Sequence, residues 1–197
     1  FQANAATITF SQERFDADAD VLTTGELQFA INYGASGTPD ATINGVLFDG
    51  HTGSGGNSLY TDGSSGVSVT VFGSSYTPFS GPADRYQGTT LTGGVYDTLL
   101  DNFAYSRQAQ NGEVVMSGLT IGVEYVVQLF IVDGVSGAAG RTIDVLSGNS
   151  GGTPALTDID SALHGTAGDA LLVTGTFTAD GTSQSLYIEL DGYETNY

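Results

Sequence analysis

Short runs in which apolar and polar residues alternate, separated by glycine-containing turns, constrain the fold of this chain most. Three valines in 67–71 alternate with Ser68 and Thr70, and the apolar residues of 186–190 repeat the pattern. This period of two is typical of half-buried β-strands. Between the runs lie Asn-Gly and Asp-Gly pairs, whose residues tolerate positive φ. Among them are those that begin at positions 44, 49, 62, 133, 180 and 191.

The predicted fold class is therefore all-β, in a single domain spanning 1–197. The runs expected to form strands are 6–10, 27–33, 42–48, 67–72, 99–105, 113–117, 124–132, 141–146, 171–178 and 185–190. We expect an antiparallel two-sheet sandwich with jelly-roll order, and an immunoglobulin-like sandwich is the alternative. Residues 124–132 are apolar on both faces except around Gln128, which predicts a central strand. The nearest helical candidate is 158–163.

The charge of the chain restricts its partners. There is no lysine, and four arginines face 22 acidic residues, for a net charge of -18. Such a surface repels nucleic acid and anionic lipid, and no apolar run is long enough for membrane insertion. Cysteine is absent, which excludes disulfides and thiolate metal sites. The acid excess, the missing lysine and the 29 glycines favour an extracellular or cell-surface location. Ala3-Asn4-Ala5 has the small-x-small pattern of a signal-peptidase site.

Two acidic segments are candidate calcium sites. Asp16, Asp18 and Asp20 stand on alternate residues, so that three carboxylates can converge on a hard cation. The spacing is not that of an EF-hand, and a solvated acidic turn is the alternative. Asp158 and Asp160 form a second candidate. Calcium is the cofactor that these residues predict.

Aromatic residues in two irregular stretches, 50–66 and 73–96, suggest a sugar-binding platform. Flat rings present apolar area with a polar rim, which suits stacking on a polysaccharide. The alternative is that these rings cap the sandwich core. The candidate residues are Tyr60, Tyr76, Phe79, Tyr86 and Tyr96.

Catalysis is not expected. Gly148-Asn149-Ser150-Gly151-Gly152 matches the pattern of a nucleophile elbow, with His164 following. That elbow requires a strand-to-helix turn, whereas Thr153-Pro154 comes next here. His51 and His164 are too few and too scattered for a zinc site. No acidic pair stands out for glycoside hydrolysis.

Several stretches together resemble the secreted β-sandwich domains of environmental bacteria that carry a C-terminal Pro-Glu-Pro sorting signal, the PEP-CTERM class. The resemblance is carried by 6–10, 20–27, 30–34, 43–48, 118–133 and 175–180. It implies an exported β-sandwich associated with the cell surface or an exopolysaccharide matrix, and it implies no catalytic residues. The chain has neither the Pro-Glu-Pro motif nor the apolar helix and basic tail. One more core strand is expected after Leu190-Asp191-Gly192. We therefore expect either that the sorting segment was removed or that the sandwich lacks a strand that another chain supplies.

These features predict an extracellular structural or adhesive protein, self-associating as a fibre, filament or surface-matrix subunit. Residues 1–10 are the candidate assembly strand, in which Ile8 and Phe10 enter apolar pockets while Thr7 and Thr9 face outward. The pockets belong to a neighbouring subunit if the strand is exchanged, and to the same chain if it is not. The alternative function is a calcium-stabilised carbohydrate-binding module of a secreted protein.

Overall fold

The computed structural model describes residues 6–35, 37–52, 58–61, 66–72, 77–79, 91, 94–105, 112–132, 142–148, 153–160 and 170–191. Its strands are β1 (Thr9–Arg14), β2 (Ile31–Gly34), β3 (Ala41–Ile43), β4 (Val46–Thr52), β5 (Ser58–Thr61), β6 (Ser68–Phe72), β7 (Thr77–Phe79), β8 (Phe103–Tyr105), β9 (Gly112–Ser117), β10 (Glu124–Ile131), β11 (Thr142–Ser147), β12 (Leu156–Ile159), β13 (Leu171–Thr178) and β14 (Ser183–Asp191). The helical elements are the 3-10 turn η1 (Asp18–Asp20) and the helix α1 (Gly94–Leu100). No helix in these residues is long and apolar enough to cross a membrane.

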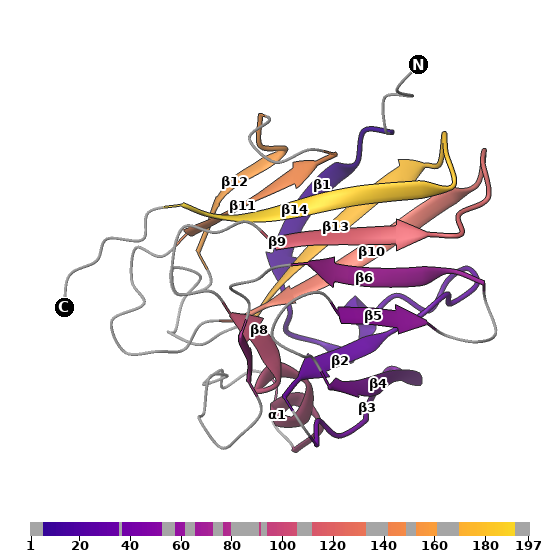
Figure 1. Cartoon of the computed structure of the whole chain (residues 1–197). Helices are drawn as coiled ribbons and strands as arrows, with labels where there is room; N and C mark the ends of the chain where they lie inside the picture. Colours follow the sequence, from indigo (N-terminus) through magenta and orange to yellow (C-terminus); the bar gives the residue numbers. More distant parts are fainter. Residues whose placement is uncertain are drawn as a thin grey trace.

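A β-sandwich forms the main body of the molecule (Figure 1). Its three-stranded sheet has the order β1-β13-β10, and its six-stranded sheet has the order β12-β11-β14-β9-β6-β5. Every pair in these two sheets is antiparallel. Side chains from both sheets share one buried cluster, in which Phe177 of β13 meets Met116 of β9 and Leu186 of β14. The predicted all-β sandwich is confirmed, and its jelly-roll order stays a prediction.

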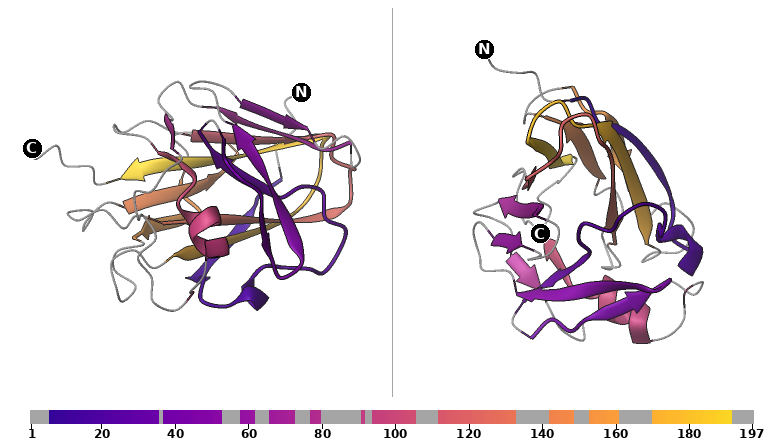
Figure 2. Two further views of the ribbon diagram at one scale, coloured as in Figure 1. Left: turned by 90° about the horizontal axis from the view of Figure 1, so that it is seen from below. Right: turned by 90° about the vertical axis from the view of Figure 1, so that its right-hand side faces the viewer.

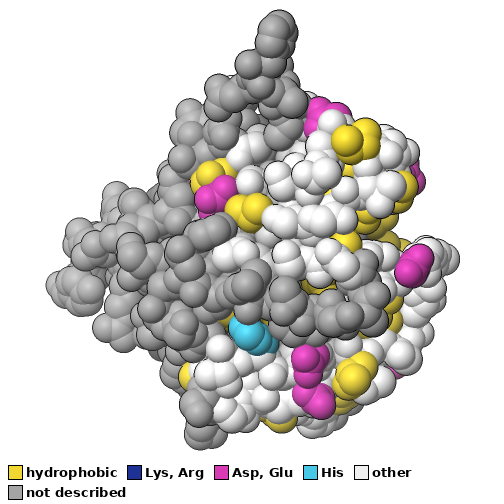
Figure 3. All heavy atoms as spheres, turned by 45° about the vertical axis from the view of Figure 1, so that its right-hand side comes forward, with side chains coloured by type: hydrophobic (Ala, Val, Ile, Leu, Met, Phe, Trp, Pro, Cys, Tyr) yellow, Lys and Arg dark blue, Asp and Glu magenta, His cyan; other side chains and the backbone are white. Residues whose placement is uncertain are grey.

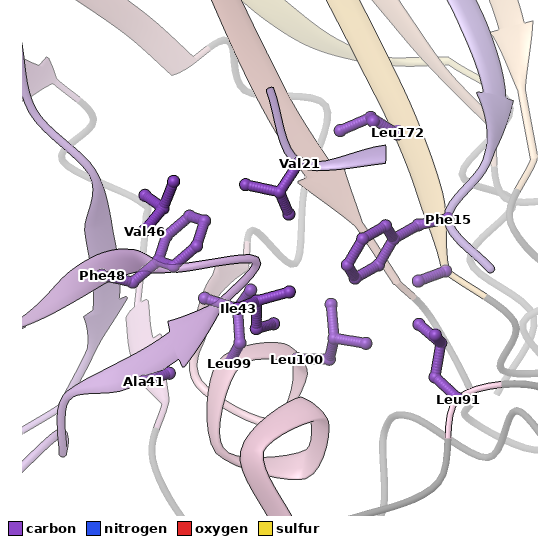
Figure 4. Close-up of a cluster of buried hydrophobic side chains, with 11 residues drawn as sticks. Phe15, Val21, Ala41, Ile43, Val46, Phe48, Leu91, Leu99, Leu100 and Leu172 are labelled. Atoms are coloured by element: carbon purple, nitrogen blue, oxygen red, sulfur yellow. The ribbon is translucent and has the colours of Figure 1, made fainter. Parts of the chain in front are cut away.

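A smaller sheet of order β2-β4-β3 lies at one end of the sandwich, together with α1 (Figure 2). Its β2–β4 pair is parallel, which departs from the expected purely antiparallel arrangement. A second buried cluster joins this sheet to the sandwich (Figure 4). The partly buried Phe130 of β10 packs against this cluster, with its ring edge-on to Phe15 and Phe48 at centroid distances of 4.9 and 5.5 Å. The outer face of the three-stranded sheet is therefore covered at the Phe130 end.

Three sequence predictions about elements were wrong. Residues 99–105 were expected as one strand, but α1 ends at Leu100 and β8 begins only at Phe103. A helix does not begin at Asp158, because Asp158 and Ile159 belong to β12. The run at 124–132 was placed centrally in a sheet, yet β10 lies at the border of the three-stranded sheet. The last described strand, β14, is flanked on both sides, by β11 and β9, so no vacant edge lies next to it.

Candidate functional site

The N-terminal segment packs within its own chain. Ile8 is 1% exposed and belongs to the cluster that holds Met116 and Phe177, and β1 pairs along its length with β13. The Ile8 main-chain N–H donates to Ser147 Oγ at 2.7 Å, and this hydroxyl in turn donates to the Ala6 carbonyl at 3.3 Å. Thr9 is exposed. Of the two arrangements considered for this strand, the structure has the intramolecular one.

Phe10 also finds its partner inside the chain. It pairs directly with Gly175 of β13. A Cβ placed on Gly175 would lie 2.6 Å from Phe10 Cε1 and 2.9 Å from Ile8 Cγ2. The Phe10 ring therefore occupies the space that a side chain at position 175 would need. Both anchor side chains are thus accommodated within one chain, and exchange of this strand with a neighbouring subunit stays a prediction.

The acidic turn at Asp16, Asp18 and Asp20 is organised by its own hydrogen bonds. Asp20 Oδ2 accepts the main-chain N–H groups of Asp16 at 3.0 Å and of Ala17 at 2.9 Å, which closes the turn that leads into η1. The Tyr96 hydroxyl donates to Asp18 Oδ1. Asp16 is exposed. Among the described residues, no three His, Cys, Asp or Glu side chains form a group that could hold a metal ion. Calcium at this turn stays a prediction.

The acidic turn is fastened to the outward face of β10. Gln128 Nε2 donates to the Asp20 carbonyl at 2.8 Å, and Gln128 Oε1 accepts the Leu22 main-chain N–H at 3.0 Å. Val21, between these two contacts, is buried in the cluster beneath the smaller sheet. The polar residue that interrupts the apolar run at 124–132 therefore serves to position residues 20–22.

The second acidic candidate is split between two environments. Asp158 is exposed, whereas Asp160 is 2% exposed. The Asp158 main-chain N–H donates to Asp144 Oδ1 at 3.0 Å, where the pairing of β11 with β12 is irregular. Asp158 has φ of 55°, an uncommon value for a non-glycine residue. A shared calcium ion between Asp158 and Asp160 stays a prediction.

Of the candidate sugar platform, Tyr96 is the member whose side chain the structure describes. It lies on α1, packs against the cluster that contains Phe15, and meets the Phe15 ring edge-on at 6.3 Å. With its hydroxyl directed to Asp18, this ring caps the core. The side chains of Tyr60 and Phe79, and the whole of Tyr76 and Tyr86, lie outside the described residues, as do Ser150 and His164 of the elbow pattern. Sugar stacking stays a prediction.

A feature that the sequence did not predict is an apolar border next to β10. Six large hydrophobic side chains are exposed among the described residues, and four of them lie on or beside this strand. These four, named here the β10 border, are Ile121 (63%), Val123 (43%), Val126 (50%) and Leu22 (42%). Ile121 and Val123 belong to the turn that leads into β10, and Leu22 is held against it through Gln128. The sequence signal for this border is that residues 124–131 are apolar on both faces of the strand.

A tyrosine on the six-stranded sheet was also missed. Tyr187 of β14 lies directly opposite Glu113 of β9, and Ser185 Oγ donates to Glu113 Oε1 at 2.9 Å. Burial, and then the hydrogen bond and negative charge of Glu113, raise the pKa of Tyr187 to about 12. The phenol is neutral at physiological pH, as an unperturbed tyrosine is, and its hydrogen bond to Glu113 has a structural role.

No protein-family model, curated protein or solved structure matches the chain. The resemblance to the PEP-CTERM class accordingly stays a prediction. Among the described residues, the β10 border gathers four of the six exposed large hydrophobic side chains.

Proposed function

We propose that this chain is a non-catalytic extracellular module, structural or adhesive, that associates with itself. Its resemblance to exported β-sandwich domains and its strongly acidic composition support a location outside the cell. Acidic side chains lie throughout the chain, yet in the described residues they form no metal-binding group.

The β10 border is the observation that carries self-association. Isolated surface hydrophobics are ordinary, but a group of them on one border marks an interaction site. In the space-filling view, separate hydrophobic side chains appear along the right-hand side, and acidic side chains lie between some of them (Figure 3). Ile121 and Val126 each leave at least half of their surface in water. Covering them in a partner removes that apolar area from solvent.

Electrostatics should control this association. Two copies, each with a net charge of -18, repel one another at low ionic strength. Salt shortens the screening length to about 8 Å at physiological strength and about 3 Å at 1 M, while it leaves apolar burial in place. Association is therefore expected to become stronger as salt is added, the reverse of what an interface made of ion pairs would do.

Sedimentation velocity across a range of protein concentrations tests this function, at about 0.02 M and about 0.5 M sodium chloride. The expected result is reversible association that strengthens at the higher salt concentration. A monomer at every concentration and both salt levels would remove the proposal. A variant with one lysine added at an exposed polar position away from the β10 border, such as Thr42→Lys on β3, controls for the effect of net charge.

A further inference from the structure

The small-x-small pattern at Ala3-Asn4-Ala5 ends one residue before the chain contacts the sandwich. Signal peptidases cleave directly after such a pattern, which requires small side chains at its first and third positions and accepts any residue between them. Cleavage after Ala5 would make Ala6 the first residue of the exported chain. The contacts of Ala6 therefore show what such a new N-terminus would meet.

The main-chain nitrogen of Ala6 lies next to a carboxylate. It donates to Asp180 Oδ1 at 3.1 Å, in a contact that is exposed to solvent. Asp180 stands in the turn between β13 and β14. A peptide N–H offers this carboxylate one hydrogen and no charge. The ammonium group of a free N-terminus offers three hydrogens and a positive charge, and charge-assisted hydrogen bonds are roughly twice as strong as neutral ones.

The turn that carries Asp180 is fixed by main-chain hydrogen bonds of the residue before it. The Ala179 N–H donates to the Val123 carbonyl at 2.9 Å, and the Ala179 carbonyl accepts the Gly122 N–H at 2.7 Å. Ala179 is also buried, with 3% of its surface exposed. The fold therefore places Asp180 beside Ala6 through contacts that involve the two turns and none of residues 1–5.

Residues 6–8 are held from a second side by a hydroxyl group. Ser147 Oγ donates to the Ala6 carbonyl at 3.3 Å and accepts the Ile8 N–H at 2.7 Å. Ile8 is buried, and the Ala6 side chain packs against the same cluster. These contacts all use residue 6 or a later one. Removal of residues 1–5 therefore leaves the attachment of the N-terminal strand in place.

The composition of the chain limits which group can supply an ammonium ion to this carboxylate. There is no lysine, so the only amine that the chain itself can provide is its N-terminus. In a molecule with a net charge of -18, a positive charge placed beside an exposed carboxylate also reduces the repulsion among acidic groups. An N-terminus at Ala6 would have both effects at Asp180.

We propose that a signal peptidase hydrolyses the bond between Ala5 and Ala6 during export, and that the new Ala6 ammonium group forms an ion pair with Asp180. Water supplies the hydroxyl that Ala5 keeps and a hydrogen for the Ala6 nitrogen. The carboxyl proton passes to this amine, whose ordinary pKa is about 8. The inference rests on the proposed extracellular location, and it does not depend on the β10 border.

Expression of the complete gene in a bacterial host tests the cleavage, by intact-mass measurement of the protein recovered outside the cells. The expected mass begins at Ala6. Ala5→Leu should abolish cleavage at this bond, whereas its matched control Asn4→Leu, at the unrestricted middle position, should be cleaved like the wild type. Another N-terminus on the exported wild type, or equal processing of both variants, would overturn this site and leave the extracellular location in place. A chain retained inside the cells would remove the location and, with it, the cleavage.

Melting of two forms of the protein, one beginning at Phe1 and one at Ala6, tests the ion pair. Both forms carry one N-terminal ammonium group, and residues 1–5 contain no charged side chain, so the net charge is equal. In the Ala6 form, Asp180→Asn should lower the melting temperature by about 1–3 °C, because it removes the charge but keeps an acceptor oxygen. In the Phe1 form the shift should stay below about 1 °C.

Asp40→Asn is the matched control for these melting experiments. Asp40 is also exposed, and its Oδ1 accepts the Gly50 main-chain N–H at 2.8 Å, which is a peptide group in both forms. This substitution should therefore shift the two melting temperatures equally. Equal shifts from Asp180→Asn in the two forms, or failure of the Ala6 form to fold, would overturn the ion pair.

Discussion

The packing of Phe10 onto Gly175 can be tested by a double-mutant cycle. In the native protein, a Cβ at position 175 would lie 2.6 Å from Phe10 Cε1. Ordinary carbon contacts are about 3.5–4.0 Å, so Gly175→Ala pushes the Phe10 ring by about 1 Å. Gly175 has the extended backbone of β13, and alanine can adopt it. Crowding by the ring is therefore the main cost of this substitution.

The expected free energies have opposite signs in the two backgrounds. Overpacking a well-filled core costs about 1–3 kcal/mol, and replacing a strand glycine by alanine returns roughly 0.5–1 kcal/mol. Gly175→Ala should therefore destabilise the wild type by about 1–2 kcal/mol. When Phe10→Ala has already removed the ring, the new methyl group has room, apart from Ile8 Cγ2 at 2.9 Å. There the substitution should be neutral or stabilising by up to about 0.5 kcal/mol.

Urea denaturation of the wild type, both single variants and the double variant measures this coupling, expected to be about 1–2.5 kcal/mol. For a chain of this length, 1 kcal/mol corresponds to about 2–4 °C in melting temperature. Additive effects of the two substitutions would refute direct packing of the ring on Gly175. The urea midpoints of the four proteins should not depend on protein concentration. Midpoints that rise with protein concentration would refute intramolecular packing, because an exchanged strand links folding to association.

Three further predictions concern the interior and the charged groups. Gln184 is 2% exposed, and its amide donates to the Ser185 carbonyl at 3.0 Å, but no described donor reaches its Oε1. Because Gln184→Leu removes this unsatisfied acceptor, it should raise the free energy of unfolding by about 1 kcal/mol, measured by urea denaturation. The pKa of Tyr187 is raised to about 12, so its stabilising contribution is complete below its unfolded pKa of about 10 and is lost as pH rises through 12. Glu113→Gln should lower the pKa of Tyr187. Ultraviolet titration of tyrosine ionisation measures this pKa, and subtraction of the Tyr187→Phe titration isolates the signal of Tyr187. Millimolar calcium should raise the melting temperature above the effect of sodium at equal ionic strength, and Asp16→Asn should abolish the difference; equal melting in calcium and EDTA would count against a bound cation.

Turn chemistry was predictable because it depends on adjacent residues. Asn44 and Gly45 have φ of 50° and 77°, and they join β3 to β4 with Ile43 opposite Val46. This is the two-residue hairpin connection that Asn-Gly favours. The alternation in 67–71 likewise predicted the burial of Val67 and Val69, each 3% exposed. The turn follows from the backbone preference of Asn and Gly, and the burial of the valines follows from the alternation of the strand. Neither feature depends on residues far away in the sequence.

The helix α1 was not predictable, because its cause lies in tertiary packing. Its seven residues are too few to display a helical period, and it begins at a glycine. Leu99 and Leu100 are both buried, at 5% and 2% exposure, in the cluster that joins the smaller sheet to the sandwich. In the sequence, two adjacent leucines are also compatible with a buried strand. The helix is favoured here because it buries both leucines in this cluster.

The acidic turn shows how residue type alone leaves a site undecided. Three carboxylates on alternate residues predict a cation site, but a carboxylate near a turn can also accept main-chain N–H groups. Asp20 does this with Asp16 and Ala17. Asp18 is directed to the Tyr96 hydroxyl, which lies far away in the sequence. The first contact is a local alternative that the spacing permits, and the second depends on the placement of α1.

Charge and edge protection are connected in this chain. Lysine is a common residue for keeping sheet edges apart, and this chain has none. Among the described edge strands, β12 is short and irregular, and β1 ends in Glu13 and Arg14. The net charge of -18 adds a protection that acts on the whole molecule at low ionic strength, because two copies repel one another. This repulsion is screened as salt rises, whereas the exposed apolar side chains of the β10 border are unchanged. We therefore expect ionic strength to control self-association, with monomers in dilute buffer and associated molecules in saline surroundings.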